Sequence, residues 1–119
     1  MTGGNGVLVV DDDVSIRLLC RINLELDGHR VREAASLGEA REALADELPV
    51  VVLLDLHIGA DSGWDLLTEI RQEYPDVRIV LLSGTAQLGP AERELADGVL
   101  PKPFPIELLA STVRRFAAV

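Results

Sequence analysis

The stretch VLVVDDDVS, residues 7–15, decides the fold, because four aliphatic residues run directly into three aspartates. A short and fully apolar run is typical of a strand that is buried on both faces. One aspartate can cap the helix that follows, and Asp13 is expected to be that cap or a solvated side chain and not a metal ligand. Capping needs one carboxylate, and three adjacent carboxylates repel one another. The surplus, Asp11 and Asp12, therefore indicates a site for a cation.

Outward from this stretch, strand and helix patterns alternate five times along the chain. The expected strands are residues 7–10, 30–34, 50–54, 78–82 and 99–100. The expected helices are residues 14–27, 36–47, 62–73, 90–96 and 105–117. Such alternation predicts a doubly wound α/β domain, in which helices cover both faces of a five-stranded parallel sheet. Helical spacing puts Ile16, Leu19, Ile22 and Leu26 on or near one face of the first helix, and Ile106, Leu109, Val113 and Phe116 along one stripe of the last.

The composition narrows the class of protein. A length of 119 residues predicts one domain, residues 1–119. The net charge of −9 argues against nucleic-acid binding by this domain. No apolar run approaches the roughly 20 residues of a membrane span, and the N-terminus has no signal-peptide pattern. The single Cys20, expected to be a buried and inert thiol, suits a reducing compartment, so a cytoplasmic location is expected.

Polar residues follow the ends of several expected strands. In doubly wound sheets, ligands bind beyond the carboxyl ends of the strands. Asp12 and Asp55 would supply oxygen ligands to Mg²⁺, with Asp11 acting directly or through water. Asp55 can also act as a nucleophile and become an aspartyl phosphate. Ser83 can donate to a phosphoryl oxygen, and Lys102, the only lysine of the chain, can add a point charge.

Four segments of the chain resemble the response-regulator receiver domains of two-component signalling. The segments are VLVVDDDVSIR, VVLLDLHIGADSG, IVLLSG and PKPF. The resemblance implies a flavodoxin-like strand order of 2-1-3-4-5 and a cis peptide bond before Pro103. It also implies the following roles: Asp55 as phosphoacceptor, Asp11 and Asp12 as the acid pair, His57 as a backbone ligand to Mg²⁺, Ser83 as the switch hydroxyl and Lys102 as the phosphate contact. The phosphoryl donor would be a histidine kinase or a phosphotransfer protein.

Three features depart from the family pattern. Val99 stands where the family often has an aromatic ring. Ser83 and Lys102 are 19 positions apart (102 − 83), which is short and predicts a shortened fourth helix. Gly59 replaces a common proline. The family's usual conformational switch and partner-binding surface are therefore not assigned to this chain. The sequence does not decide whether the signal passes to a downstream protein or to an attached output domain.

Two other functions compete with this interpretation. Asp11, Asp13 and Ser15 form a DxDxS pattern close to that of haloacid-dehalogenase phosphatases, in which Asp11 would be the nucleophile of a Mg²⁺-dependent enzyme. The chain has only Glu107 as an acid after Lys102, whereas that family needs a later acidic pair. The second alternative is an interaction module that never carries phosphate. A receiver would not be an enzyme on separate substrates, because its chemistry is limited to its own phosphorylation and slow dephosphorylation.

Overall fold

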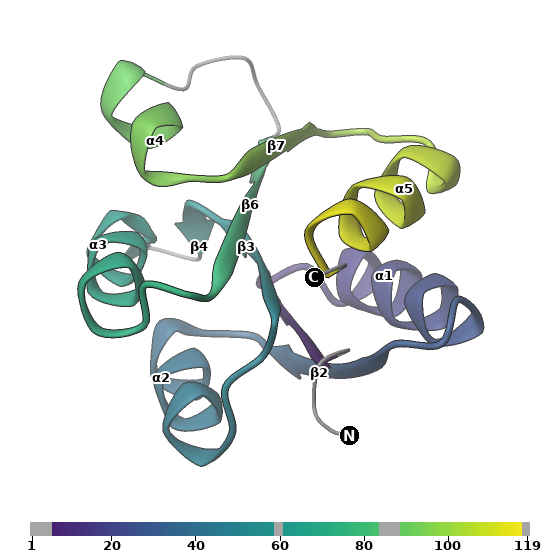
Figure 1. Cartoon of the computed structure of the whole chain (residues 1–119), viewed down its shortest axis with the longest axis horizontal. Helices are drawn as coiled ribbons and strands as arrows, with labels where there is room; N and C mark the ends of the chain where they lie inside the picture. Colours follow the sequence, from purple (N-terminus) through teal and green to yellow (C-terminus); the bar gives the residue numbers. More distant parts are fainter. Residues whose placement is uncertain (1–5, 59–60, 84–88, 118–119) are drawn as a thin grey trace.

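The computed structural model describes residues 6–58, 61–83 and 89–117. Five parallel strands form one sheet, flanked by five helices (Figure 1). The strands of this sheet are β1 (Gly6–Val10), β2 (Arg30–Ala34), β3 (Val51–Asp55), β6 (Arg78–Ser83) and β7 (Gly98–Pro101). The helices are α1 (Val14–Leu26), α2 (Leu37–Asp46), α3 (Trp64–Glu73), α4 (Pro90–Leu95) and α5 (Ile106–Ala117). The strand order is β2-β1-β3-β6-β7, which confirms the predicted order of the five long strands.

Helices cover both faces of the sheet, as the alternating pattern predicts. The side chains of each strand point alternately to the two faces, so Leu8 and Val10 pack on one side, while Val7 and Val9 pack on the other. The first side is covered by α2, α3 and α4, and the second by α1 and α5 (Figure 1). Cys20 of α1 lies in the second layer, where burial raises the pKa of its thiol to about 12. This confirms the prediction of a buried thiol, and at that pKa it stays protonated and unreactive.

The inner face of α1 differs from the prediction. Cys20 and Leu24 are fully buried, whereas Ile22 is 50% exposed and Leu26 is 82% exposed. An α-helix turns by about 100° per residue, so Ile22 points about 120° away from Ile16 and cannot share its face. Ile106, at the first turn of α5, is also more exposed than predicted, whereas Leu109 and Val113 are buried as expected.

A short antiparallel hairpin between β3 and α3 was not predicted. Its strands are β4 (His57–Ile58) and β5 (Asp61–Ser62), with His57 opposite Ser62. The hairpin delays the start of α3, which begins at Trp64 after the N-cap Gly63 and not at Ser62. The fourth helix, α4, has six residues and is the shortest of the helices described, which confirms the predicted shortening. Gly59 lies outside the described residues, so its expected effect on this loop stays a prediction.

Among the described residues, no helix is both long and apolar enough to cross a membrane.

Candidate functional site

Two neighbouring strands bring the predicted carboxylates together. β1 and β3 are paired in parallel with Val10 opposite Leu54, so Asp11 and Asp55 follow at the same edge of the sheet. The backbone N–H of Asp11 continues the pairing of β1 with β2 by donating to the carbonyl of Ala34. Asp11, Asp12 and Asp55 each have a carboxylate oxygen within 4.8 Å of the others. The geometry therefore confirms the cluster that the sequence predicts.

Asp11 is the most deeply buried carboxylate of this cluster. It is fully buried, its Oδ1 accepts the backbone N–H of Asp13 at 2.9 Å, and its Oδ2 lies 2.7 Å from Nζ of Lys102. Nη1 of Arg17 donates to the backbone carbonyl of Asp11 at 2.7 Å, a contact that the sequence analysis missed. Burial raises the pKa of Asp11 more than the contacts with Lys102 and Asp13 lower it. Ionisation of this carboxyl therefore costs free energy unless a further positive charge is near.

Asp13 acts as a helix cap. It is the N-cap of α1, and its Oδ1 accepts the backbone N–H groups of Ser15 at 2.8 Å and Ile16 at 3.4 Å. These bonds satisfy donors that have no partner inside the helix. Asp13 thus serves α1, as predicted, and Asp12 is the exposed carboxylate of the cluster.

Asp55 is the last residue of β3 and is 7% exposed. Its Oδ1 accepts the backbone N–H of His57 at 2.9 Å, and its Oδ2 lies 3.2 Å from Nζ of Lys102. His57 is an exposed residue. Its N–H orients Asp55, whereas the metal contact expected of its backbone carbonyl stays a prediction.

Gly63 lies against the backbone of Asp55 and Leu56 at the end of β3. Its N–H donates to the carbonyl of Leu56 at 2.7 Å, which folds the chain back onto the end of β3. A Cβ atom at Gly63 would lie 2.9 Å from the carbonyl oxygen of Asp55 and 2.9 Å from Cα of Leu56. Only glycine fits so close to another backbone without displacing it. Sequence reasoning assigned Gly63 no role, although it lies within one of the quoted segments.

Lys102 reaches the cluster from the loop after β7, which begins with a cis peptide bond between Lys102 and Pro103, as the resemblance implies. Its ammonium contacts Asp11 and Asp55 together. Burial lowers the pKa of Lys102, but the hydrogen bond and charge of Asp11, together with Asp55, outweigh that effect and raise it. Lys102 is therefore charged at neutral pH. Counted formally, three carboxylates and one ammonium carry a charge of −2, and oxygen ligands with that formal charge fit a hard divalent cation.

Ser83, the predicted switch hydroxyl, and Val99, which stands where the family often has an aromatic ring, belong to β6 and β7. Ser83 ends β6, and its backbone pairs with Pro101 of β7, but its side chain is outside the part of the chain that the structure describes. The expected role of the Ser83 hydroxyl therefore stays a prediction. Val99 is partly buried and packs against the core layer of α2, α3 and α4.

Comparisons with known proteins agree with this geometry. The family model of the response regulator receiver domain matches residues 7–114. The chain is 37% identical over 120 residues to the sensor kinase CckA of Brucella abortus, covering 96% of this chain but 13% of that protein. The chain therefore spans only a small part of that relative.

Two solved structures extend the comparison. The receiver domain of NtrX from Brucella abortus has a TM-score of 0.87 and 31% identity, covering 93% of this chain and 97% of that one. A response regulator from Burkholderia pseudomallei, solved with a phosphorylated aspartic acid, calcium ion and citrate, has a TM-score of 0.81 and 30% identity. That match covers 96% of this chain and 69% of the other.

Proposed function

Because the chain belongs to the response regulator receiver domain family and is a phosphoacceptor domain of two-component signalling, we propose that Asp55 receives its phosphoryl group. The observation that carries the proposal is the difference between two carboxylates of one cluster. The side chain of Asp11 is 0% exposed, and both of its oxygens accept hydrogen bonds. The side chain of Asp55 is 11% exposed, and its Oδ2 has only the longer, 3.2 Å contact with Lys102. Of these two buried carboxylates, Asp55 is therefore the one that a donor can reach.

The transfer needs few protein groups. A lone pair on Oδ2 of Asp55 attacks the phosphorus atom of a phosphohistidine on the donor protein, while the P–N bond breaks. The imidazole nitrogen keeps the electron pair and leaves as neutral imidazole when the other ring nitrogen carries a proton. The N–H of His57 holds Oδ1, so that Oδ2 faces the donor. Lys102 then moves from Oδ2 to the new phosphoryl oxygens, where its charge is attracted more strongly.

Asp11, Asp12 and Asp55 would hold Mg²⁺, together with the backbone carbonyl of His57. The bound metal would offset the negative charge of the phosphoryl oxygens. Three oxygen ligands within 4.8 Å of one another and a formal charge of −2 support this assignment. The relative from Burkholderia pseudomallei, crystallised with a phosphorylated aspartic acid and a calcium ion, gives further support. Slow attack of water on the phosphorus would return Asp55 and inorganic phosphate. This is the only turnover proposed, so the chain would not be an enzyme on separate substrates.

The donor would dock on α1. Val14, Leu18 and Ile22 are 63%, 53% and 50% exposed and recur every four residues, so they form one apolar row. The row starts next to the Asp13 cap, within a turn of the acidic cluster. A helical histidine kinase or phosphotransfer protein that covers this row would bring its phosphohistidine to Asp55. The phosphorylated domain would then act on a downstream protein or an attached output domain, in the cytoplasm, where the free thiol of Cys20 persists.

Intact-mass analysis tests the assignment. Incubation with acetyl phosphate and Mg²⁺ should add one phosphoryl group to the wild-type protein. Asp55→Asn should remain unlabelled, whereas Asp11→Asn keeps Asp55 and can still be labelled. Stoichiometric labelling of Asp55→Asn would disprove the role of Asp55. Steady hydrolysis of external phosphomonoesters that depends on Asp11 would favour the phosphatase alternative instead. No label under any condition would favour the interaction module.

A further inference from the structure

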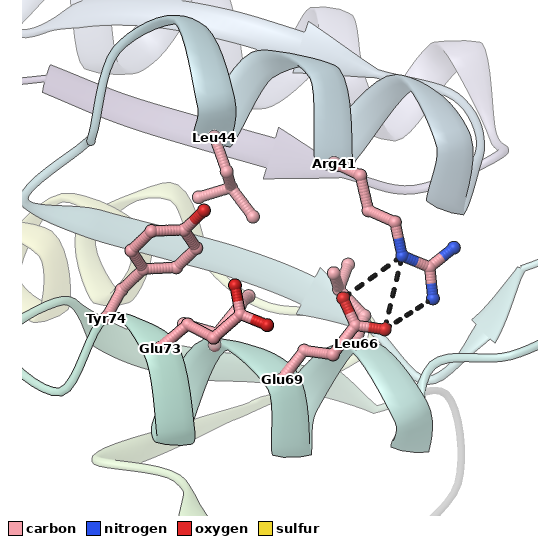
Figure 2. A pocket seen from close by; sticks show the side chains of 7 residues that line it. Arg41, Leu44, Leu66, Glu69, Glu73 and Tyr74 are labelled. Carbon is pink, nitrogen blue, oxygen red and sulfur yellow. Dashed lines mark hydrogen bonds and ion pairs between the residues drawn. The ribbon is translucent and has the colours of Figure 1, made fainter.

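A pocket lies between α2 and α3 (Figure 2). None of the residues that line it belongs to the aspartate cluster. It encloses about 180 Å³. Leu44 of α2 and Leu66 and Ile70 of α3 form its apolar floor, and all three belong to the buried core. The volume is well below the roughly 300–1,000 Å³ of ordinary small-molecule sites, so a single side chain is a better match than a cofactor.

The rim of the pocket is polar and negatively charged. Arg41 donates from Nε and Nη2 to the carboxylate of Glu69, with a shortest distance of 2.7 Å, so that its charge is already compensated. The hydrogen bond with Arg41 lowers the pKa of Glu69, which is therefore ionised at neutral pH. Glu73 lies one turn further along α3, and its carboxylate points from that helix toward α2 (Figure 2). It has no hydrogen-bond or ion-pair partner among the residues that the structure describes.

The surrounding helices carry the same sign of charge. Together α2 and α3 contain six acidic and two basic residues, which gives a formal charge of −4 (2 − 6). One of the two bases is Arg41. The other, Arg71, is directed away from the pocket, because its Nη2 bonds Asp97 at 2.8 Å. The field over the pocket therefore attracts a cation and repels an anion.

Tyr74 adds an aromatic wall at the end of α3. Its ring lies opposite Leu44 and beside Glu73 (Figure 2). A ring face attracts a cation through its quadrupole, and a planar guanidinium also stacks on it. The pocket thus combines an apolar floor for methylene groups, an aromatic wall for a planar cation and an unpaired carboxylate at the rim.

We propose that this pocket binds one basic side chain, preferably an arginine, from a partner protein. The methylene groups of the arginine would pack on Leu44, Leu66 and Ile70. Its guanidinium would stack on Tyr74 and pair with Glu73. The compact and strongly hydrated ammonium of lysine would gain less from the ring, which sets the preference for arginine. The site is independent of the phosphoacceptor role, so either proposal can fail without the other.

Capped amino acids provide the probes for the test. N-acetyl-arginine methylamide is titrated into the uniformly labelled protein and followed by NMR, in parallel with the capped lysine and with capped citrulline, the neutral isostere of arginine. Mg²⁺ is kept in excess, so that the aspartate cluster is not the preferred cation site. We expect the shift changes to centre on Leu44, Ile70 and Tyr74. We also expect the affinity to decrease from arginine to lysine to citrulline.

Three variants separate the contributions to binding. Glu73→Gln should weaken arginine binding by about two- to fivefold, the range measured for solvent-accessible ion pairs. Tyr74→Leu should weaken it as well, whereas Tyr74→Phe keeps the ring and should bind like the wild type. The matched control is Glu42→Gln, which removes an exposed carboxylate of α2 outside the pocket and should leave the affinity unchanged.

Several outcomes would overturn the proposal. Citrulline binding as tight as arginine binding would show that the carboxylate of Glu73 does not recognise the charge of the probe. A loss of affinity in Glu42→Gln equal to that in Glu73→Gln would show the same. NMR shift changes confined to the residues around Asp11 and Asp55 would show that the probe binds at the aspartate cluster and not in the pocket. Concentration-dependent shifts at Tyr74 without any probe, together with dimerisation in sedimentation, would assign the pocket to a second copy of this chain.

Discussion

The ammonium of Lys102 lies 2.7 Å from Oδ2 of Asp11, although the two residues are 91 positions apart. Lys102 follows the edge strand β7, whereas Asp11 follows β1, and two strands of the sheet lie between them. The same ammonium contacts Asp55 at the end of β3. A single cation therefore joins three parts of the sheet edge and partly neutralises a buried carboxylate before any metal or phosphate binds.

Replacing Lys102 by methionine should destabilise the fold. The change keeps most of the side-chain volume but leaves the buried carboxylate of Asp11 without its cation. We expect the free energy of unfolding to fall by about 1–3 kcal/mol at neutral pH, measured by urea denaturation in EDTA. Arg30→Met is the control, because its ion pair with Glu47 is solvent-accessible and should contribute less than about 1 kcal/mol. Equal losses in the two variants would contradict a special role for Lys102.

The Asp11→Asn variant should make the metal-free protein more stable at neutral pH. Burial raises the pKa of Asp11 above its ordinary value of 3.8, so the folded state favours the protonated carboxyl. The contribution of this group to stability is largest below the unfolded pKa and is lost as the pH rises through the folded pKa. Denaturation in EDTA should therefore show a gain for Asp11→Asn that grows from about pH 4 to neutral pH. A constant difference across this range would show that the titration of Asp11 is not its cause.

Mg²⁺ should stabilise the protein through the same cluster. A ligand that binds only the native state adds stability by linkage, about 2.7 kcal/mol at a hundredfold excess over its dissociation constant. Asp12→Asn should remove most of this gain and change the metal-free stability little, because Asp12 is exposed. The neighbouring Asp13→Asn variant is the control, since asparagine caps a helix as well as aspartate. Thermal melts with and without Mg²⁺ would measure both variants. A wild-type melting temperature that does not change with Mg²⁺ would argue against the site.

The sequence predicts the site well where local patterns determine position. Apolar runs define where a parallel strand ends, so the residues that follow, such as Asp55 and Lys102, could be assigned to one edge of the sheet. The inner face of α1 was harder to predict, because apolar residues such as Ile22 and Leu26 occur outside the stripe that Cys20 and Leu24 bury. When apolar residues occur around much of a helix, the hydrophobic periodicity alone does not identify the face that packs on the sheet.

Contacts between distant backbones could not be predicted from the same patterns. The requirement for glycine at position 63 arises only because the chain returns so close to the end of β3 that a Cβ atom there would lie 2.9 Å from the carbonyl oxygen of Asp55. His29 lies between α1 and β2, where its side chain is 8% exposed and both ring nitrogens lack a hydrogen bond among the described residues. Its burial depends on how α1 and β2 meet, which no local pattern determines.

Asp97 should stabilise the edge of the sheet opposite the aspartate cluster, where β7 begins. Its carboxylate accepts the N–H of Ile79 at 2.8 Å and pairs with Arg71 and Arg78. Burial alone would raise the pKa of Asp97, but these hydrogen bonds outweigh it and lower the pKa below 3.8. The stabilisation is therefore present above the unfolded pKa and is lost as the pH falls through the folded pKa.

Asp97→Asn should consequently reduce the free energy of unfolding by about 1–3 kcal/mol at neutral pH. The difference from the wild type should shrink in acid below about pH 4, where the wild-type carboxylate becomes protonated. Asp76→Asn changes an exposed aspartate that has no described ion pair, and it should have little effect. Urea denaturation over this pH range measures both variants, and a loss for Asp97→Asn that does not depend on pH would rule out charge as the reason.

The last prediction concerns the glycine behind Asp55. In Gly63→Ala, the added methyl group would meet the carbonyl oxygen of Asp55 and Cα of Leu56, both at 2.9 Å and both part of the backbone. Because neither atom can rotate away, the end of β3 or the start of α3 must shift. We expect a loss of about 1–3 kcal/mol in the free energy of unfolding, typical of an overpacked interior. We also expect slower labelling by acetyl phosphate, since the same shift moves the carboxylate of Asp55.

The matched control is Gly38→Ala in the first turn of α2. A Cβ atom there would have only Oγ of Ser36 nearby, at 3.9 Å, and alanine favours the helix by roughly 0.5–1 kcal/mol. Gly38→Ala should therefore be as stable as the wild type or more so, and it should be labelled at the wild-type rate. Gly63→Ala could also fold with wild-type stability and accept phosphate at the wild-type rate. In that case the end of β3 and the start of α3 would have separated without affecting the carboxylate, so their close approach does not position Asp55.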